Sequence, residues 1–169
     1  RCSIIGPELN NKNSLLEWFL TREAREVING YDHHFWNGVT TLQFAQLCER
    51  IIIGNEFDSM RKINHVLHYC INESVSKYQL LLIFREVFKK NISVTKIDES
   101  KKMDRTLASI CLINEKRKMF DSVNELNKFI LKIELRLGTI PCPKYSSLNE
   151  LIILRISETL NLLVSSNLT

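Results

Sequence analysis

The chain has 169 residues, of which 44% are hydrophobic and 25% are charged, and its net charge is +4. This is an ordinary soluble composition with enough apolar material for the core of one domain, so disulfides are not needed as staples. The positive charges form short, dispersed runs, which argues against a nucleic-acid-binding stripe and leaves an anionic small molecule compatible with the charge.

The five cysteines lie far apart, and no two form a Cys-x-x-Cys pair. This spacing argues against a zinc site and a thioredoxin-like motif. An odd number without a framework indicates a reducing compartment, so we expect a cytoplasmic protein. No signal peptide is visible, and no apolar run reaches the roughly 18 residues that span a membrane. The sequence starts at Arg1 in a predicted strand, so we expect either a fragment or a natural short protein.

Strand and helix signals alternate over the first 97 residues. Short apolar and β-branched runs predict strands, whereas Ser, Thr or Asn ahead of periodic apolar stretches predicts capped helices. The expected elements are, in chain order, a strand in 1–8, a helix at 15–21, a strand at 26–31, a helix at 41–53, a strand at 64–71, a helix from 74 or 76 to 89 and a strand at 92–97. This alternation predicts an α/β fold.

Local signals refine two of these elements. Asn29-Gly30 is a turn signal at the end of the second strand. The helix at 41–53, ended by Gly54, carries apolar residues on more than one stripe, so we expect it to be buried on most sides.

The composition changes after Arg105. Ser122 caps a predicted helix whose apolar residues recur every three or four positions and which ends at Gly138. After a Pro-rich loop, a last helix is predicted to begin at residue 146 or 147 and to end near 164. We therefore divide the chain into residues 1–109 and a helical extension at 110–169, expected to be an antiparallel αα-hairpin.

Two stretches are candidates for a binding site. Residues 30–45, GYDHHFWNGVTTLQFA, place histidines and aromatic side chains before a helix, whose first N–H groups can meet an anionic ligand. The alternative is an ordinary loop with its aromatic rings in the core. Arg105, after a strand and loop, can bind a diphosphate in bidentate fashion, and its alternative is an exposed ion pair with Asp104.

The sequence supplies no catalytic or metal-binding motif. Its glycines form neither a dinucleotide fingerprint nor a P-loop, and no serine lies in a Gly-x-Ser-x-Gly turn. His65 and His68 would point to opposite faces of a strand, so they do not form a ligand pair. Ser76-Lys77-Tyr78 is interpreted as a helix cap, a solvated lysine and a core tyrosine. We therefore assign no catalytic and no metal-binding residue.

Four segments in order resemble the C-terminal half of extended short-chain dehydrogenases/reductases. The similarity is to the branch of dTDP-4-dehydrorhamnose reductase and the sugar-nucleotide epimerases and reductases of bacterial polysaccharide synthesis, and it covers residues 1–109. The segments are RCSIIGPELNNKNSLLEWFL, NGYDHHFWNGVTTLQFAQLCERII, INESVSKYQLLLIFREVF and DRTLAS. The resemblance implies the substrate-binding part of a Rossmann-type fold.

The resemblance also implies a function. In that family a Gly-rich turn binds NAD(P) and a Tyr-x-x-x-Lys pair carries out the proton and hydride chemistry, and this sequence contains neither. It therefore implies the sugar-nucleotide-binding portion of an NAD(P)-dependent reductase or epimerase, inactive alone and binding no cofactor alone. The alternative is a non-catalytic binding or protein-interaction module derived from the fold.

The same resemblance implies the ligand and the partners. The ligand is a nucleotide-activated sugar, and the partner is either a Rossmann half or a second copy of the chain. The residues expected to bind the substrate are Ser3, Asn13, His34, Trp36, Asn37 and Arg105. Without the Rossmann half, apolar surface is expected to be exposed, with Ile4, Ile5, Leu81 and Phe84 as candidates.

Overall fold

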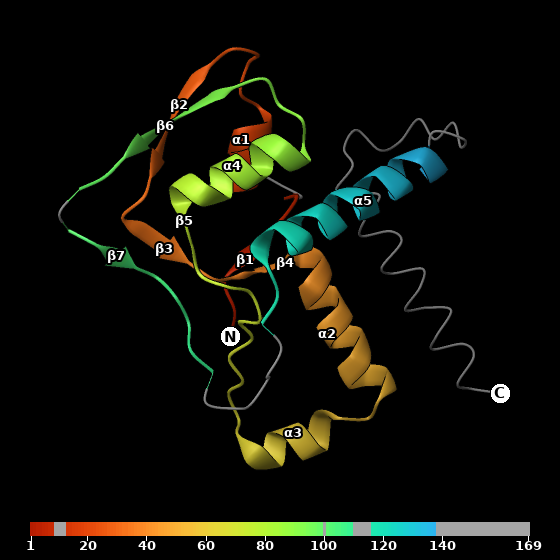
Figure 1. Ribbon diagram of the computed structural model, residues 1–169. Helices are drawn as coiled ribbons and strands as arrows, with labels where there is room; N and C mark the ends of the chain where they lie inside the picture. Colours follow the sequence, from red (N-terminus) through yellow and green to blue (C-terminus); the bar gives the residue numbers. More distant parts are fainter. Residues whose placement is uncertain (9–12, 100, 110–115, 138–169) are drawn as a thin grey trace.

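The computed structural model describes residues 1–8, 13–99, 101–109 and 116–137, and these form a mixed α/β structure (Figure 1). The strands are β1 (Ile4–Ile5), β2 (Val27–Tyr31), β3 (His34–Trp36), β4 (Val39–Thr40), β5 (Val75–Ser76), β6 (Ser93–Ile97) and β7 (Met103–Asp104). The helices are α1 (Leu15–Leu20), α2 (Thr41–Ile53), α3 (Phe57–Ile63), α4 (Lys77–Val87) and α5 (Met119–Leu137). The helix expected at 146–164, and with it the αα-hairpin, lies outside the described residues.

The strands form three small sheets. β1 pairs with β4 in parallel, and β2 pairs with β6 in parallel. The third sheet has the order β5-β3-β7, in which β3 is antiparallel to β5 and parallel to β7. Because parallel neighbours need long crossovers, helices α2, α3 and α4 lie in the sequence between β2 and β6. The predicted α/β class is confirmed.

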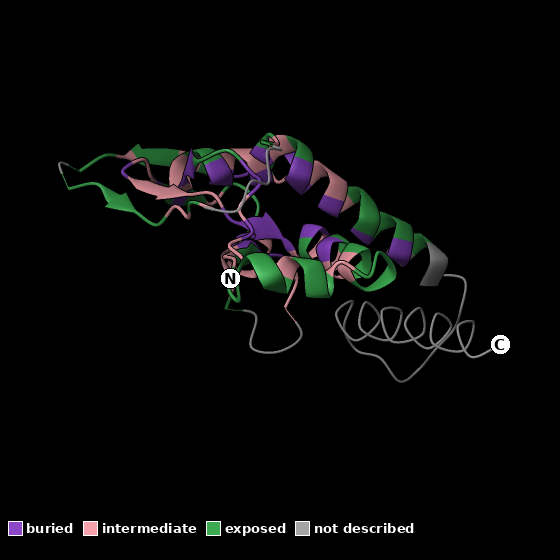
Figure 2. Cartoon of the chain, turned by 90° about the horizontal axis from the view of Figure 1, so that it is seen from below, coloured by how far each residue is buried: buried purple, intermediate pink, exposed green. Residues whose placement is uncertain are grey.

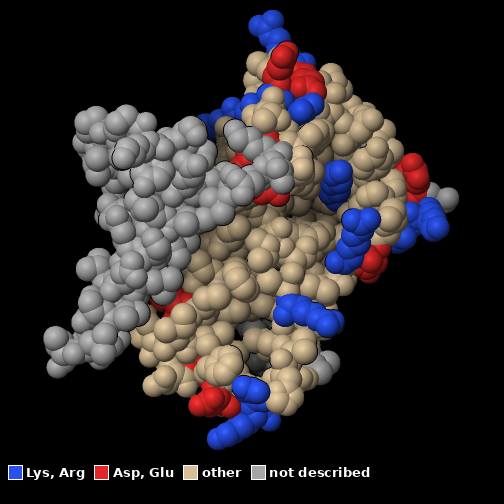
Figure 3. Space-filling model, turned by 180° about the vertical axis from the view of Figure 1, so that it is seen from behind, with Lys and Arg blue, Asp and Glu red and all other residues tan. Residues whose placement is uncertain are grey.

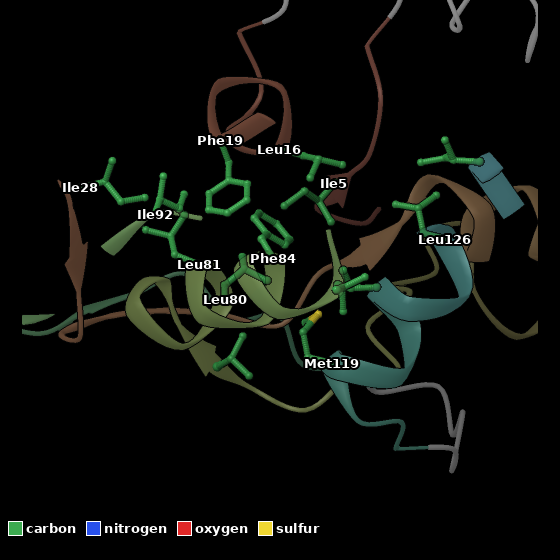
Figure 4. Packing of buried hydrophobic residues seen from close by; sticks show 14 residues of the cluster. Ile5, Leu16, Phe19, Ile28, Leu80, Leu81, Phe84, Ile92, Met119 and Leu126 are labelled. Atoms are coloured by element: carbon green, nitrogen blue, oxygen red, sulfur yellow. The ribbon is translucent and has the colours of Figure 1, made fainter. Parts of the chain in front are cut away.

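Helix α4 lies at the centre of the main core (Figure 4). Its buried residues, Leu80, Leu81, Phe84 and Val87, form one stripe of the helix, which α1 and α5 cover. Phe84 meets Phe19 of α1 edge to face, with ring centroids 5.4 Å apart. Along α5, buried and exposed residues alternate with the period of a helix (Figure 2), so one face of α5 packs on the core. Among the described residues, no helix has both the length and the apolar character to cross a membrane.

Helix caps define where the main helices begin. The hydroxyl of Thr40 accepts a hydrogen bond from the Gln43 N–H (3.2 Å), and the Gln43 side chain accepts one from the Thr40 N–H (2.9 Å). Ser76 and Gln79 form the same capping box at α4. Ser14 caps α1. The prediction that Ser or Thr hydroxyls cap these three helices is confirmed.

Three predictions about local structure in the first half are wrong. Asn29-Gly30 lies inside β2, where Gly30 lets α4 approach, because a Cβ there would come within 2.8 Å of the Tyr78 ring. Residues 34–36 form a strand, β3, rather than a loop. Helix α2 buries only Gln43 and Leu47, because its far end reaches solvent and leaves Ile52 62% exposed.

Three further predictions are wrong for physical reasons of their own. Residues 64–71 form no strand. The Leu67 carbonyl and the Tyr69 N–H both form hydrogen bonds with the backbone of Arg1, but this one pair of bonds does not extend into the repeated pairing of a β-sheet. Ser122 lies inside α5, not at its start. Ile5, Leu81 and Phe84 are buried, because α1 and α5 cover them, whereas Ile4 is 45% exposed as expected.

Candidate functional site

Strand β3 carries two of the predicted site residues, His34 and Trp36, and pairs with the strand that precedes a third, Arg105. Its register sets Trp36 opposite Val75 of β5 and His34 opposite Met103 of β7. Directly opposite residues share a face, and residues two apart in a strand point the same way. The register therefore places His34, Trp36 and Arg105 on one face, and the Arg105 N–H donates to the Phe35 carbonyl at 3.0 Å.

Trp36 ties the N-terminal segment to β3. Its Nε1–H donates to Ser3 Oγ at 2.6 Å, and the Ser3 carbonyl accepts from the Val39 N–H at 2.8 Å. The indole lies close over Gly38, where a Cβ would come within 2.1 Å of the ring. Since its only polar group is used inside the chain, Trp36 can offer a ligand an apolar ring surface, whereas the Ser3 hydroxyl can still donate.

Asn37 uses both ends of its side chain on one backbone residue. Its Nδ2 donates to the Leu107 carbonyl and its Oδ1 accepts from the Leu107 N–H, both at 2.8 Å. This pair fixes the segment that carries Arg105. In this structure Asn37 is therefore a positioning residue.

His34 lies in an aromatic cluster. Its ring stacks on Tyr31, with centroids 5.1 Å apart, and meets His33 edge-on at 4.3 Å. Partial burial, followed by the nearby charges of His33, Lys77 and Arg105, lowers the pKa of His34 below its ordinary value. The lowered pKa favours the neutral ring, whose nitrogens can form hydrogen bonds with a ligand.

Arg105 is exposed, and among the described residues no carboxylate lies within ion-pair distance of it. The carboxylate of Asp104 instead accepts from the Thr106 N–H at 2.9 Å, and the register turns Asp104 to the other face. Of the two interpretations of Arg105, the ion pair with Asp104 is therefore wrong.

Asn13 is the predicted site residue that the structure does not bring to β3. It is exposed just before α1, and its described hydrogen bond runs from its backbone N–H to Glu8 (2.6 Å). In the described part of the chain, no three His, Cys, Asp or Glu side chains are grouped as metal ligands. An open groove between α2 and α5 contains none of the predicted residues.

Sequence reasoning missed Lys77. It was interpreted as solvated, but it is only partly exposed, and its Nζ lies 5.4 Å from the Tyr31 ring centre and 6.0 Å from that of Trp18. Burial, then the charge of Arg105, lowers the pKa of Lys77. A usable signal was present: Ser76 is a strong cap, and a cation in the first turn of the helix that follows is opposed by the helix dipole.

Comparisons with known proteins identify the fold. No family model matches the chain, and no curated protein matches it significantly. A solved structure of dTDP-4-dehydrorhamnose reductase from Clostridium acetobutylicum is similar over 76% of this chain and 46% of that chain, with 12% identity and a TM-score of 0.53. Another, from Bacillus anthracis in complex with NADP, shares 12% identity over 76% of this chain and 45% of that chain, with a TM-score of 0.43.

The first of these structures defines the class of fold. The chain has a mixed α/β fold that resembles part of the Rossmann-type fold of dTDP-4-dehydrorhamnose reductase. The fold expected from the sequence is confirmed. The chain spans about half the length of the solved structures that it matches.

Proposed function

We propose that this chain is the sugar-nucleotide-binding portion of an NAD(P)-dependent reductase or epimerase of bacterial polysaccharide synthesis. The observation that carries the proposal is Arg105. It has no carboxylate at ion-pair distance among the described residues, and it shares a sheet face with Trp36. The fold likeness to dTDP-4-dehydrorhamnose reductase adds support for the class of ligand.

Each site residue is suited by its chemistry to a different group of the proposed nucleotide-sugar ligand. The planar guanidinium of Arg105 matches the oxygens of a diphosphate in bidentate geometry. The ring of Trp36 provides an apolar wall, and the Ser3 hydroxyl and the His34 ring offer hydrogen bonds to sugar hydroxyls. Asn37 holds the Arg105 segment through Leu107. These groups bind and orient a substrate.

The described residues do not fit NAD(P) as a resident cofactor. Gly30 and Gly38 are needed for close packing of Tyr78 and Trp36, and neither belongs to a phosphate-binding turn. In the proposed function, a cytoplasmic Rossmann half holds NAD(P) and supplies the catalytic pair. This chain alone binds no cofactor and is inactive without that half.

A second candidate is a non-catalytic interaction module derived from the same fold. It is favoured by exposed apolar side chains at the end of α2 and along α3, where Ile53 is 61%, Phe57 59% and Ile63 76% exposed. Exposed apolar groups on neighbouring elements are typical of protein-binding surfaces. This candidate predicts partner binding without affinity for nucleotide sugars.

Calorimetric titration with a dTDP-sugar tests the proposal. We expect saturable binding by the intact chain, and Arg105→Ala should weaken it about tenfold or more, because a charge-assisted hydrogen bond contributes roughly 1.5–3 kcal/mol. Arg85→Ala, which removes an exposed arginine on α4, serves as the matched control and should leave the affinity unchanged. A cooperatively folded chain that gives no heat with nucleotide sugars would refute the proposal and favour the interaction module.

A further inference from the structure

Lys77 is a partly buried cation with no carboxylate at ion-pair distance among the described residues. Burial of an ammonium group is unfavourable unless the charge is paired. The rings of Tyr31 and Trp18 compensate only in part, because at 5.4 and 6.0 Å they lie near the outer limit of cation–π contacts. The positive charge of Lys77 is therefore available to an anion from outside the chain.

Three acidic side chains around β3 have partners other than Lys77. Asp32 accepts from the Ser76 hydroxyl at 2.5 Å with one oxygen and pairs with Lys96 at 2.6 Å with the other. Asp104 accepts from the Thr106 N–H. The Glu99 carboxylate lies 3.8 Å from His33 Nε2. Among the described residues, none of these carboxylates forms an ion pair with Lys77.

A second cation lies near Lys77. The two flank β3, since Lys77 follows β5 and Arg105 follows β7, and the charge of Arg105 is felt at Lys77. Both charges also act on His34, which stands between them on β3. Figure 3, which views the molecule from behind, shows Lys and Arg side chains spread along one side, with a few acidic side chains among them. Two unpaired cations that repel each other are stabilised together by one anion that bridges them.

We propose that Lys77 and Arg105 form a two-cation subsite for a diphosphate group, with Tyr31 and Trp18 beside Lys77. A diphosphate carries charge on two phosphorus centres, so it can meet both cations at once, whereas a single carboxylate would satisfy one. The inference rests on the proposed function in taking this group to be the diphosphate of a nucleotide sugar. It assigns a binding role to Lys77, the residue that directly follows the Ser76 cap.

The test titrates the 169-residue chain with inorganic pyrophosphate, inorganic phosphate and a dTDP-sugar at constant ionic strength. Lys77→Gln should weaken pyrophosphate and dTDP-sugar binding by about tenfold, and Lys77→Arg should retain most of the affinity. Lys62→Gln, an exposed lysine on α3, is the matched control and should change neither. Phosphate should bind more weakly than pyrophosphate, because it spans only one cation.

A variant-free measurement covers the case in which Lys77→Gln does not fold. Anion binding should raise the pKa of the Lys77 amine in the intact chain, as followed by NMR of the lysine side chains. An unchanged pKa at saturating pyrophosphate, or equal pyrophosphate affinity in Lys77→Gln and the intact chain, would overturn the subsite. If dTDP-sugars bind in an Arg105-dependent but Lys77-independent manner, the subsite fails while the proposed function stands. If pyrophosphate binds through Lys77 but dTDP-sugars bind no tighter, the subsite stands and the proposed function fails.

Discussion

Asp32 shows how single side chains near the site are fixed by their partners. Its carboxylate pairs with Lys96 and accepts from Ser76, the cap of the helix that begins with Lys77. The hydrogen bond from Lys96, followed by that from Ser76, lowers the pKa of Asp32, and the same pair raises the pKa of Lys96. This ion pair therefore links β2, β6 and the start of α4 beside the proposed ligand site.

The lowered pKa of Asp32 predicts a particular acid dependence of stability. Its contribution is fully present above the ordinary aspartate pKa and is lost as the pH falls through the lowered value, because the unfolded chain then binds more protons than the folded one. Asp32→Asn should therefore reduce the free energy of unfolding at neutral pH and flatten its fall under acid. Urea denaturation from about pH 6 to about pH 3 measures this. Parallel curves for the two proteins would show that Asp32 is not the source.

At the scale of elements, α5 is joined to the site through buried polar side chains. Ser122 Oγ donates to Asn72 Oδ1, and Gln43 Nε2 donates to both Ser122 Oγ and Asn72 Oδ1, at 2.8–3.0 Å. Asn72 Nδ2 in turn donates to the Gly38 carbonyl at 2.7 Å, directly after Trp36 and Asn37. Helix α5 thus braces the turn that presents the site.

Breaking this network should affect both stability and binding. Ser122→Ala leaves buried partners unsatisfied and should cost about 1–3 kcal/mol, which chemical denaturation measures. Because the network holds the turn after β3, dTDP-sugar affinity should also fall, whereas Lys132→Ala, an exposed change on the same helix, should alter neither. A Ser122→Ala chain that is less stable but binds normally would confine the network to a purely structural role.

The sequence predicts elements whose signals are local and misses those whose partners are distant. Thr40 and Ser76 identify the starts of α2 and α4 because a cap acts within three residues. By contrast, β3 and β7 are short, and their strand character depends on pairing across 69 residues, as between His34 and Met103. The same distinction between local signals and distant partners applies to the site residues. Trp36 and Arg105 were predicted from the resemblance, whereas Lys77 acquires its surroundings only from the register of the three-stranded sheet.

At the scale of the whole molecule, the main hydrophobic core around α4 packs against the strands that form the site. Helix α4 packs against β2 and β6 on one side and against α1 and α5 elsewhere, so that the strands around β3 are carried on a continuous apolar cluster. The chain spans 46% of the length of the dTDP-4-dehydrorhamnose reductase whose fold it shares. A portion with a core of its own is able to bind a ligand even if the chemistry requires another half.

The central claim is that the face of β3 binds a nucleotide sugar. The chain contains two tryptophans, Trp18 and Trp36, so two indole N–H signals are expected in a proton–nitrogen NMR spectrum. Titration with a dTDP-sugar should shift the Trp36 signal, assigned with Trp36→Phe, in a saturable manner and leave the amides of α3 unchanged. A spectrum of the folded chain in which the Trp36 signal stays fixed at saturating ligand would contradict the account.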